Sequence, residues 1–158
     1  MIQQLEYSKL RDKCVRYLIE RKYITLATSY QDQVRSRIVD YVNGGITIGF
    51  FTWDNTVKVE HIKHNPRVAL AVDNLQIEGM AKIIGHPPLS DHASFMEIYQ
   101  ERLPSPYKNF TSLPNALWII VEPTLLIMMK YEDQHLYSDY LDVIQQTAYR
   151  KELSPWNP

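Results

Sequence analysis

The segment from Phe51 to Lys58 carries residue types that bind phosphate. It reads Phe-Thr-Trp-Asp-Asn-Thr-Val-Lys and leads from the end of an expected strand into a short expected helix over residues 56–64. The first turn of a helix has free backbone N–H groups and the positive end of the helix dipole, and both favour an anion. Thr52 and Thr56 add hydroxyl donors, and Lys58 adds a cation. The pattern indicates a phosphate site, although a capped helix with a solvated lysine has the same spacing.

Two more cations lie on the preceding strand, which is expected over Val34–Val42. Side chains alternate between the two faces of a strand, so Arg35 and Arg37 share one face with Val39 and Tyr41. The opposite face has Val34, Ser36, Ile38 and Asp40. Guanidinium groups beside apolar neighbours are costly unless water or an anion meets them. This face is therefore either solvated, with surface ion pairs, or it lies along an anionic ligand.

The elements that must position these residues are mostly strands. The expected elements are a helix over residues 5–21, six or seven short strands between residues 23 and 131, a helix from about residue 90 to Arg102 with a loop to about residue 114, and a helix over about residues 137–149. Asn43-Gly44-Gly45 marks a hairpin. Because strands and helices do not alternate throughout, the pattern favours a mainly β antiparallel barrel with flanking helices.

Composition limits the class of protein. A length of 158 residues predicts a single domain, residues 1–158. The 17 basic and 18 acidic residues nearly cancel, which argues against a nucleic-acid binder. Cys14 has no partner for a disulfide, which fits a reducing, cytoplasmic location. Residues 1–6 lack the pattern of a secretion signal, and the apolar runs are too short for a membrane span, so no membrane contact is expected.

Several catalytic motifs are missing from the sequence. It contains no G-x-G-x-x-G, no Walker phosphate loop, no H-E-x-x-H and no G-x-S-x-G. His61 and His64 stand three residues apart on the expected helix but have no third ligand, so no metal site is predicted. We find no convincing general acid or base, and the catalytic residues stay unassigned. Hydride or electron transfer needs no protein nucleophile.

Six short segments between residues 23 and 85 share their order and spacing with one family. They are Leu26-Ala27-Thr28-Ser29, Arg37-Ile38-Val39-Asp40-Tyr41, Phe51-Thr52, Thr56-Val57-Lys58, Asn65-Pro66-Arg67-Val68-Ala69-Leu70 and Gly79-Met80-Ala81. Together they resemble the pyridoxamine 5′-phosphate oxidase-like flavoproteins. The resemblance implies a six- or seven-stranded antiparallel split β-barrel, an FMN cofactor and a homodimer with FMN at its interface.

The resemblance also implies which residues contact the cofactor. Arg37 matches the arginine that begins the strand beside the flavin. Ile38 and Val39 would offer backbone groups to the isoalloxazine edge. Phe51 and Thr52 match an aromatic–threonine pair near the cofactor.

The remaining cofactor residues that the resemblance implies lie at the helix start and on a later strand. Thr56 stands where the family often has serine, and Lys58 matches its phosphate-binding lysine. Val57 belongs to the same segment but stands where an arginine is common, which removes one cation. Gln76 matches a flavin-contacting glutamine, with Asn74 as the alternative.

Two departures separate the chain from the vitamin oxidase itself. Val42 stands where that enzyme has a lysine, and its C-terminal R-x-H substrate motif is absent from residues 154–158. The chain resembles the general-stress and nitroimidazole-reductase-like branches of the family better than the vitamin oxidase.

The expected function is an FMN-dependent oxidoreductase acting on a small substrate that the sequence does not identify. The alternatives are a non-catalytic flavin protein for storage or sensing, and a haem-binding split barrel. The candidate haem ligands are His61, His64, His86, His92 and His135.

Overall fold

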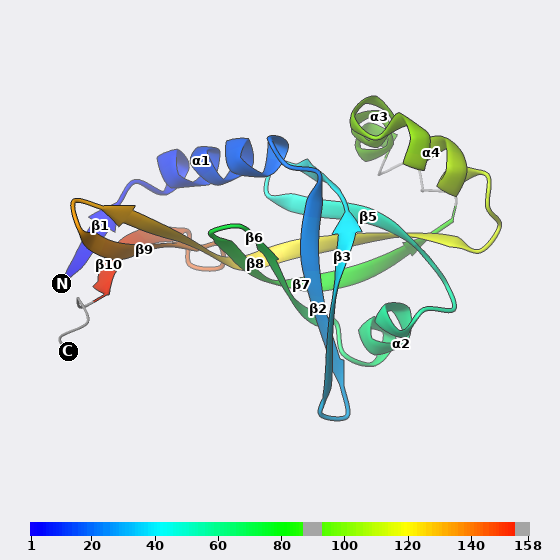
Figure 1. Ribbon diagram of the computed structural model, residues 1–158, viewed down its shortest axis with the longest axis horizontal. Helices are drawn as coiled ribbons and strands as arrows, with labels where there is room; N and C mark the ends of the chain where they lie inside the picture. Colours follow the sequence, from blue (N-terminus) through cyan, green and yellow to red (C-terminus); the bar gives the residue numbers. More distant parts are fainter. Residues whose placement is uncertain (87–92, 154–158) are drawn as a thin grey trace.

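The computed structural model describes residues 1–86 and 93–153 and folds them around one antiparallel sheet (Figure 1). The strands are β1 (Ile2–Leu5), β2 (Tyr23–Tyr30), β3 (Gln33–Asp40), β4 (Val42–Gly44), β5 (Thr47–Trp53), β6 (Arg67–Val72), β7 (Leu75–Gly85), β8 (Ala116–Glu132), β9 (His135–Asp142) and β10 (Thr147–Leu153). The helices are α1 (Tyr7–Ile19), α2 (Val57–His64), α3 (Ala93–Arg102) and α4 (Pro104–Thr111). None of the helices in these described parts is long and apolar enough to cross a membrane.

The strands follow the order β1-β10-β9-β8-β7-β6-β2-β3, and β5 pairs with both β4 and β8. The region predicted to form the barrel contributes β2 to β8, seven strands among the residues described, in agreement with the six or seven expected. The mainly β, antiparallel class with flanking helices is confirmed. In Figure 1, α1 runs along the end of the sheet that contains β1, β9 and β10, while α2 lies beside the β2–β3 hairpin.

Two apolar clusters hold these elements together. The larger one lies inside the barrel, where Leu26 and Phe50 pack beside Leu18 of α1 and Val59 of α2. Strand β6 shows the alternation that produces it, because every second side chain is buried. The smaller cluster joins β5 and β8 to α3 and α4 around Trp118. Helices α1 and α2 therefore pack on the larger cluster, and α3 and α4 pack on the smaller one.

The prediction of a helix over about residues 137–149 is wrong. This segment forms the β9–β10 hairpin, and β9 pairs with β8 over eight residue pairs. Tyr137, Leu141 and Ile144 have a spacing that fits a helix, but the segment is also rich in tyrosine, which favours strands. The long strand β8 would otherwise present an unpaired edge, and pairing with β9 satisfies its backbone groups. The hairpin in turn recruits β1, which pairs with β10.

The segment after Arg102 differs from the loop that was predicted there. It forms α4, with Pro104 and Pro106 in its first turn, where a missing N–H costs no helical hydrogen bond. Helix α3 begins at Ala93, and the predicted cap at Ser90 or Asp91 lies outside the described residues. As a result, α4 brings Phe110 to the side of β5.

Candidate functional site

A cavity of about 300 Å³ opens between the end of β3, β5, the start of α2 and α4. Its lining residues are Tyr23, Ile38, Val39, Asp40, Phe51, Thr52, Trp53, Lys58 and Phe110. Five of these, Ile38, Val39, Phe51, Thr52 and Lys58, are among the nine cofactor residues predicted from the sequence. Residues from five separate elements, β2 among them through Tyr23, therefore meet at one place.

One end of the cavity carries the hydroxyl and ammonium groups. Lys58 Nζ donates a hydrogen bond to Thr52 Oγ1 over 3.0 Å, and Thr52 Oγ1 lies 3.4 Å from Thr56 Oγ1. The Thr56 side chain does not cap α2, because its hydroxyl donates to the carbonyl of Trp53. The simple interpretation of Thr56 as a helix cap is therefore wrong. The three side chains converge, as an anion site requires.

A second cation, Arg37, approaches this end from β3. Its Nη1 donates to Thr28 Oγ1 over 2.8 Å and to the Leu26 carbonyl over 3.3 Å. Arg37 does not itself line the cavity, but it lies close enough to Lys58 to repel it. Burial lowers the pKa of Lys58, and Arg37 lowers it further. The pKa of Arg37 is also lowered, first by burial and then by Arg35.

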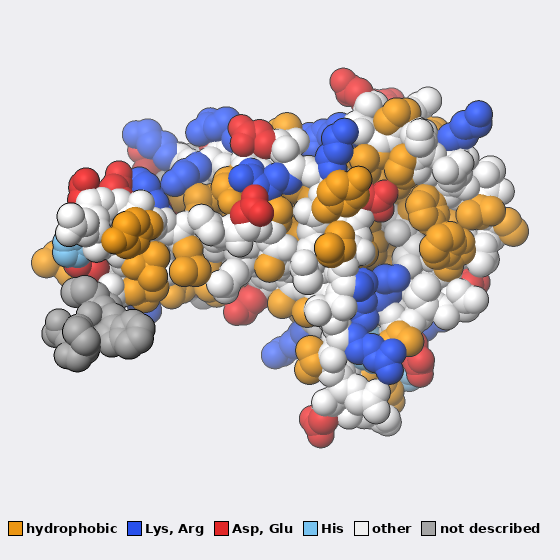
Figure 2. Space-filling view, viewed as in Figure 1, with side chains coloured by type: hydrophobic (Ala, Val, Ile, Leu, Met, Phe, Trp, Pro, Cys, Tyr) orange, Lys and Arg blue, Asp and Glu red, His pale blue; other side chains and the backbone are white. Residues whose placement is uncertain are grey.

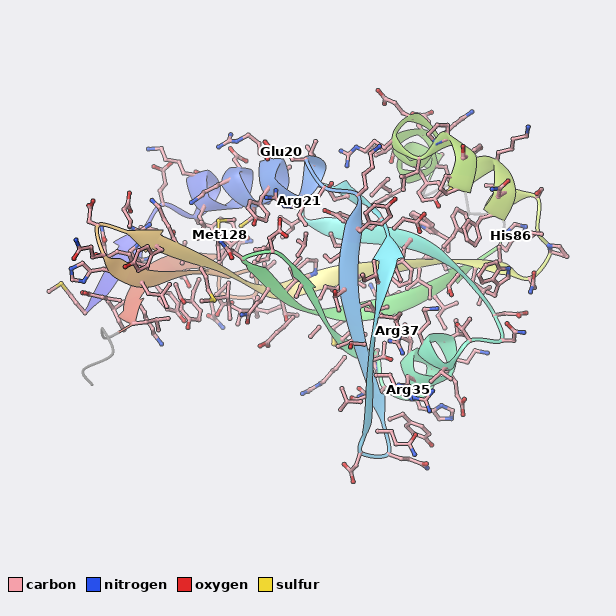
Figure 3. The ribbon with its side chains drawn as sticks, viewed as in Figure 1. Glu20, Arg21, Arg35, Arg37, His86 and Met128 are labelled. Atoms are coloured by element: carbon pink, nitrogen blue, oxygen red, sulfur yellow. The ribbon has the colours of Figure 1, made fainter. Side chains whose placement is uncertain are left out.

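These three cations have no acidic partner. In the described parts of the chain, Arg35, Arg37 and Lys58 form no ion pair with any carboxylate. Figure 2 shows basic side chains gathered between the β2–β3 hairpin and α2, and Figure 3 shows Arg35 and Arg37 on β3 beside that helix. Like charges brought together without counter-ions raise the local positive potential and attract an anion.

The other end of the cavity is aromatic. The ring of Phe110 lies almost parallel to that of Phe51, with centroids 5.9 Å apart, and 5.2 Å from that of Trp53. Phe51 is held from behind by Trp118 and Tyr99, whose ring centroids lie 4.9 and 5.2 Å away. Aromatic faces of this kind suit a flat heteroaromatic ring. The site thus combines an anion-binding end with a flat apolar wall.

Four predicted residues lie outside the cavity lining, of which Arg37 is described above. Thr56 contacts the site through Thr52, and Val57 is a partly exposed residue in the first turn of α2. Gln76 is farther away, on β7, where its amide lies 4.0 Å from the sulfur of Met129. Two strands, β2 and β6, separate Ile38 on β3 from Gln76 on β7 along one row of paired residues, a span of about 14 Å. Within one chain, Gln76 does not join the other cofactor residues.

Asp40 is a cavity residue that the sequence analysis did not single out. Strand alternation predicts that it faces away from Arg37, but it is the last residue of β3, where the strand ends at the cavity. Its carboxyl is half-buried, and burial raises its pKa. Phe110 was also missed, because its segment was expected to be a loop. Trp53 could be found from the sequence, since it directly follows the predicted Thr52.

None of the described histidines that were considered as haem ligands lines this cavity. His61, His64 and His135 each use Nδ1 in a hydrogen bond within the protein. His92 lies outside the described residues, and none of the lining residues that the structure places is a histidine. Across the same described ranges, no three His, Cys, Asp or Glu side chains gather as a metal site would require. The groups that converge here suit an anion.

Comparisons with known proteins concern the family and the fold. The family model described as pyridoxamine 5′-phosphate oxidase matches residues 10–130. No curated protein matches the sequence. Among solved structures, a pyridoxamine 5′-phosphate oxidase-related, FMN-binding protein from Nostoc punctiforme is 14% identical, with 94% of this chain and 95% of that chain covered and a TM-score of 0.63.

Two further structures have the same fold and different ligands in their names. A FAD-binding protein from Mesorhizobium loti is 13% identical, with 98% of both chains covered and a TM-score of 0.60. The heme storage protein HutZ from Vibrio cholerae is 14% identical, with 75% of this chain and 91% of that chain covered and a TM-score of 0.60. Likeness at these identities concerns the fold alone, and it confirms the predicted split barrel.

Proposed function

Because the chain belongs to the pyridoxamine 5′-phosphate oxidase family, we propose that it binds FMN in the cavity between β3, β5, α2 and α4 and acts as an oxidoreductase on a small substrate. The observation that carries the proposal is the convergence of Lys58, Thr52 and Thr56 at one end of an aromatic-walled cavity. A phosphate monoester matches the cationic end, and a flat ring system matches the aromatic wall.

Each part of the site would have a distinct task. Lys58, Thr52 and Thr56 would hold the phosphate, with Val57 at the same turn and Arg37 adding positive charge. The backbone of Ile38 and Val39 would face the ring edge. When bound, FMN supplies the hydride or electron transfer, and the protein supplies binding, orientation and electrostatics.

A second copy of the chain would complete the site. Members of this family are typically dimeric. Val34 and Ile38 are 72% and 71% exposed on the outer face of β3, and Gln76 lies on the same face. An open apolar sheet face of this kind suits an interface between copies. Gln76 would then contact FMN from the partner, which explains its distance from Lys58 within one chain.

The vitamin oxidase activity itself is not part of the proposal, since the substrate groups of that enzyme are missing from the sequence. A role close to the general-stress and nitroimidazole-reductase-like branches is favoured. A cytoplasmic location fits Cys14, which is a buried free thiol. Turnover of a reduced nicotinamide by FMN-loaded protein would separate an oxidoreductase from a storage or sensing protein.

The binding proposal is tested by titrating the flavin-free protein with FMN and with riboflavin, which lacks the phosphate. The Lys58→Glu variant replaces attraction by repulsion, and we expect it to weaken FMN binding about 100-fold or more while riboflavin binding changes little. Lys63→Glu, on the exposed side of α2, is the matched control and should leave both affinities unchanged. Equal FMN affinity in Lys58→Glu and wild type would reject the proposed phosphate site.

The dimer is tested separately by sedimentation. Replacing Ile38 by Glu places a charge on the exposed apolar face, and the expected result is a monomer that retains its fold but binds FMN weakly. A wild-type protein that stays monomeric at micromolar concentration while binding FMN tightly would contradict a shared site.

A further inference from the structure

A chain of hydrogen bonds links three elements behind the cationic end of the cavity. Arg37 of β3 donates from Nη1 to Thr28 Oγ1 of β2 over 2.8 Å. Thr28 Oγ1 in turn lies 3.0 Å from Nδ1 of His61, which belongs to α2. The same guanidinium nitrogen lies 3.3 Å from the carbonyl oxygen of Leu26. Arg37 is thus fixed from behind by a hydroxyl and a backbone carbonyl, and the hydroxyl is held in turn by an imidazole.

The directions of these hydrogen bonds follow from the donor and acceptor chemistry. A guanidinium group can only donate, so the Thr28 oxygen must accept from Arg37. The hydroxyl proton of Thr28 then needs an acceptor, because Thr28 is 2% exposed and an unpaired buried donor is costly. The only acceptor in this hydrogen-bond chain is Nδ1 of His61, which is itself 4% exposed. We therefore assign His61 as neutral, with its proton on Nε2.

The neutrality of these partners matters for the charge of Arg37. An arginine is commonly fixed by a carboxylate, but a carboxylate at this place would cancel its charge and compete with an anionic ligand. Thr28 and His61 fix the orientation of the guanidinium group and leave its charge available. Groups that are oriented before the ligand arrives need no reorganisation on binding.

We propose that His61, acting through Thr28, is a positioning residue that holds the Arg37 guanidinium ready for the phosphate of the flavin. This inference rests on the proposed function, because it takes the ligand at the Lys58 end to be a phosphate. It assigns to His61 a role that is neither metal binding nor haem ligation. His61 itself touches neither the cavity nor the ligand.

The test is a double-mutant cycle on FMN affinity. Thr28→Val removes the hydroxyl and nearly keeps the volume, and we expect it to weaken FMN binding about tenfold, since it releases a charge-assisted hydrogen bond. Riboflavin affinity should stay the same. In an Arg37→Met background, Thr28→Val should change FMN affinity by less than about twofold, because its effect passes through Arg37. Thr147→Val, on β10, is the matched control and should have no effect.

Three further variants, Thr28→Ser, His61→Leu and His61→Gln, keep the proposal testable if Thr28→Val does not fold. Thr28→Ser retains the hydroxyl and should bind FMN almost as wild type does. His61→Leu should weaken FMN binding, and His61→Gln, which keeps an acceptor, should recover part of the loss. The inference is overturned if Thr28→Val or His61→Leu has the same effect with and without Arg37, or weakens riboflavin equally. It is also overturned if Arg37→Met leaves FMN affinity unchanged. An unchanged Lys58→Glu variant would instead reject the phosphate site as a whole.

Discussion

Two partly buried arginines on strands of the same sheet have opposite surroundings. Arg150, on β10, donates from Nε and Nη2 to both carboxylate oxygens of Asp139, over 2.6 and 2.9 Å. Arg37, on β3, has only neutral partners. The hydrogen bond that Arg150 donates to Asp139 raises the pKa of Arg150, whereas burial and Arg35 lower the pKa of Arg37. One arginine belongs to a completed ion pair, and the other lacks the anion that would complete it.

The difference extends to the regions around the two arginines. We call β1, β9, β10 and α1 the terminal lobe. Around it, Lys130 pairs with Glu132, and His135 lies 2.6 Å from Glu152. In the cavity region, by contrast, three cations, Arg35, Arg37 and Lys58, approach one another and form no ion pair with a carboxylate of the described residues. Charges that stabilise a fold are paired within it, so a cluster kept unpaired at a cavity is best explained by a ligand.

The largest expected effect concerns the terminal lobe. Asp139→Asn removes the nearer and more deeply buried counter-charge of the Arg150 guanidinium and leaves only Glu132, whose Oε2 lies 3.8 Å from Arg150 Nη1. Breaking a buried pair in this way should lower the free energy of unfolding by about 3 kcal/mol. Urea denaturation measures this loss, and FMN affinity of the folded variant should be unchanged. If FMN affinity fell as strongly as stability, the two regions would not be independent.

The next largest effect concerns the cavity. Removing a charge there should raise the free energy of unfolding, whereas removing the charge of Asp139 lowers it. Burial and Arg37 lower the pKa of Lys58, so the folded state binds its proton less tightly than the unfolded state does. The charged ammonium therefore costs stability at pH values below its folded pKa, and the cost fades as the pH rises from that value toward 10.5.

Lys58→Met should accordingly stabilise the flavin-free protein, by less than about 1 kcal/mol because the group is half exposed. It should also weaken FMN binding by about 2 kcal/mol, since a charge-assisted contact is lost. Thermal unfolding with and without FMN measures both changes. Destabilisation of the flavin-free protein by Lys58→Met would show that Lys58 is structural.

Ionic strength should separate the regions by a smaller amount. The cationic end of the cavity is partly exposed to solvent. FMN binding there should therefore weaken about fivefold, or roughly 1 kcal/mol, between 50 and 500 mM salt. The Asp139–Arg150 pair is shielded from solvent, so its contribution should hardly respond. The penalty of Asp139→Asn, measured at both salt concentrations, provides the control. Salt-independent FMN binding would mean that the cations do not meet the phosphate.

The cationic end of the cavity could be predicted because it depends on one short segment. Thr52, Thr56 and Lys58 follow one another at a strand end and a helix start, and their hydroxyl and ammonium groups meet in the structure. The N-terminal helix and the antiparallel class also depend on local periodicity. The structure has α1 at Tyr7–Ile19, inside the predicted range.

The features of the fold and of the cavity that could not be predicted depend on contacts between distant segments. The apolar spacing around Leu141 fits a helix as well as a strand, and only the edge of β8 decides in favour of β9. Phe110 reaches the cavity through α4, whose prolines suggested a loop. The partnership of His61 with Thr28 joins residues 33 positions apart, which no spacing rule connects.

The smallest expected effect concerns Asp40, the acid that lies at the cavity. Burial raises its pKa above the ordinary value of 3.8, so the folded state binds a proton more tightly than the unfolded state does. Stability therefore falls as the pH rises through the interval between the two values, and the cost is complete above the folded pKa.

Asp40→Asn removes a half-buried charge and should raise the free energy of unfolding at pH 7 by a few tenths of a kcal/mol. The gain should disappear well below pH 3.8, at about pH 3, where wild-type Asp40 is largely protonated in both states. Urea denaturation at about pH 7 and about pH 3 checks this sign, and an equal gain at both would assign the effect to packing. Asp40 also borders the proposed flavin site, so the same variant should bind FMN slightly more tightly by removing a negative charge. Weaker FMN binding would instead indicate that the carboxylate accepts a hydrogen bond from the flavin, which would make Asp40 the one acidic ligand in a region otherwise built from unpaired cations.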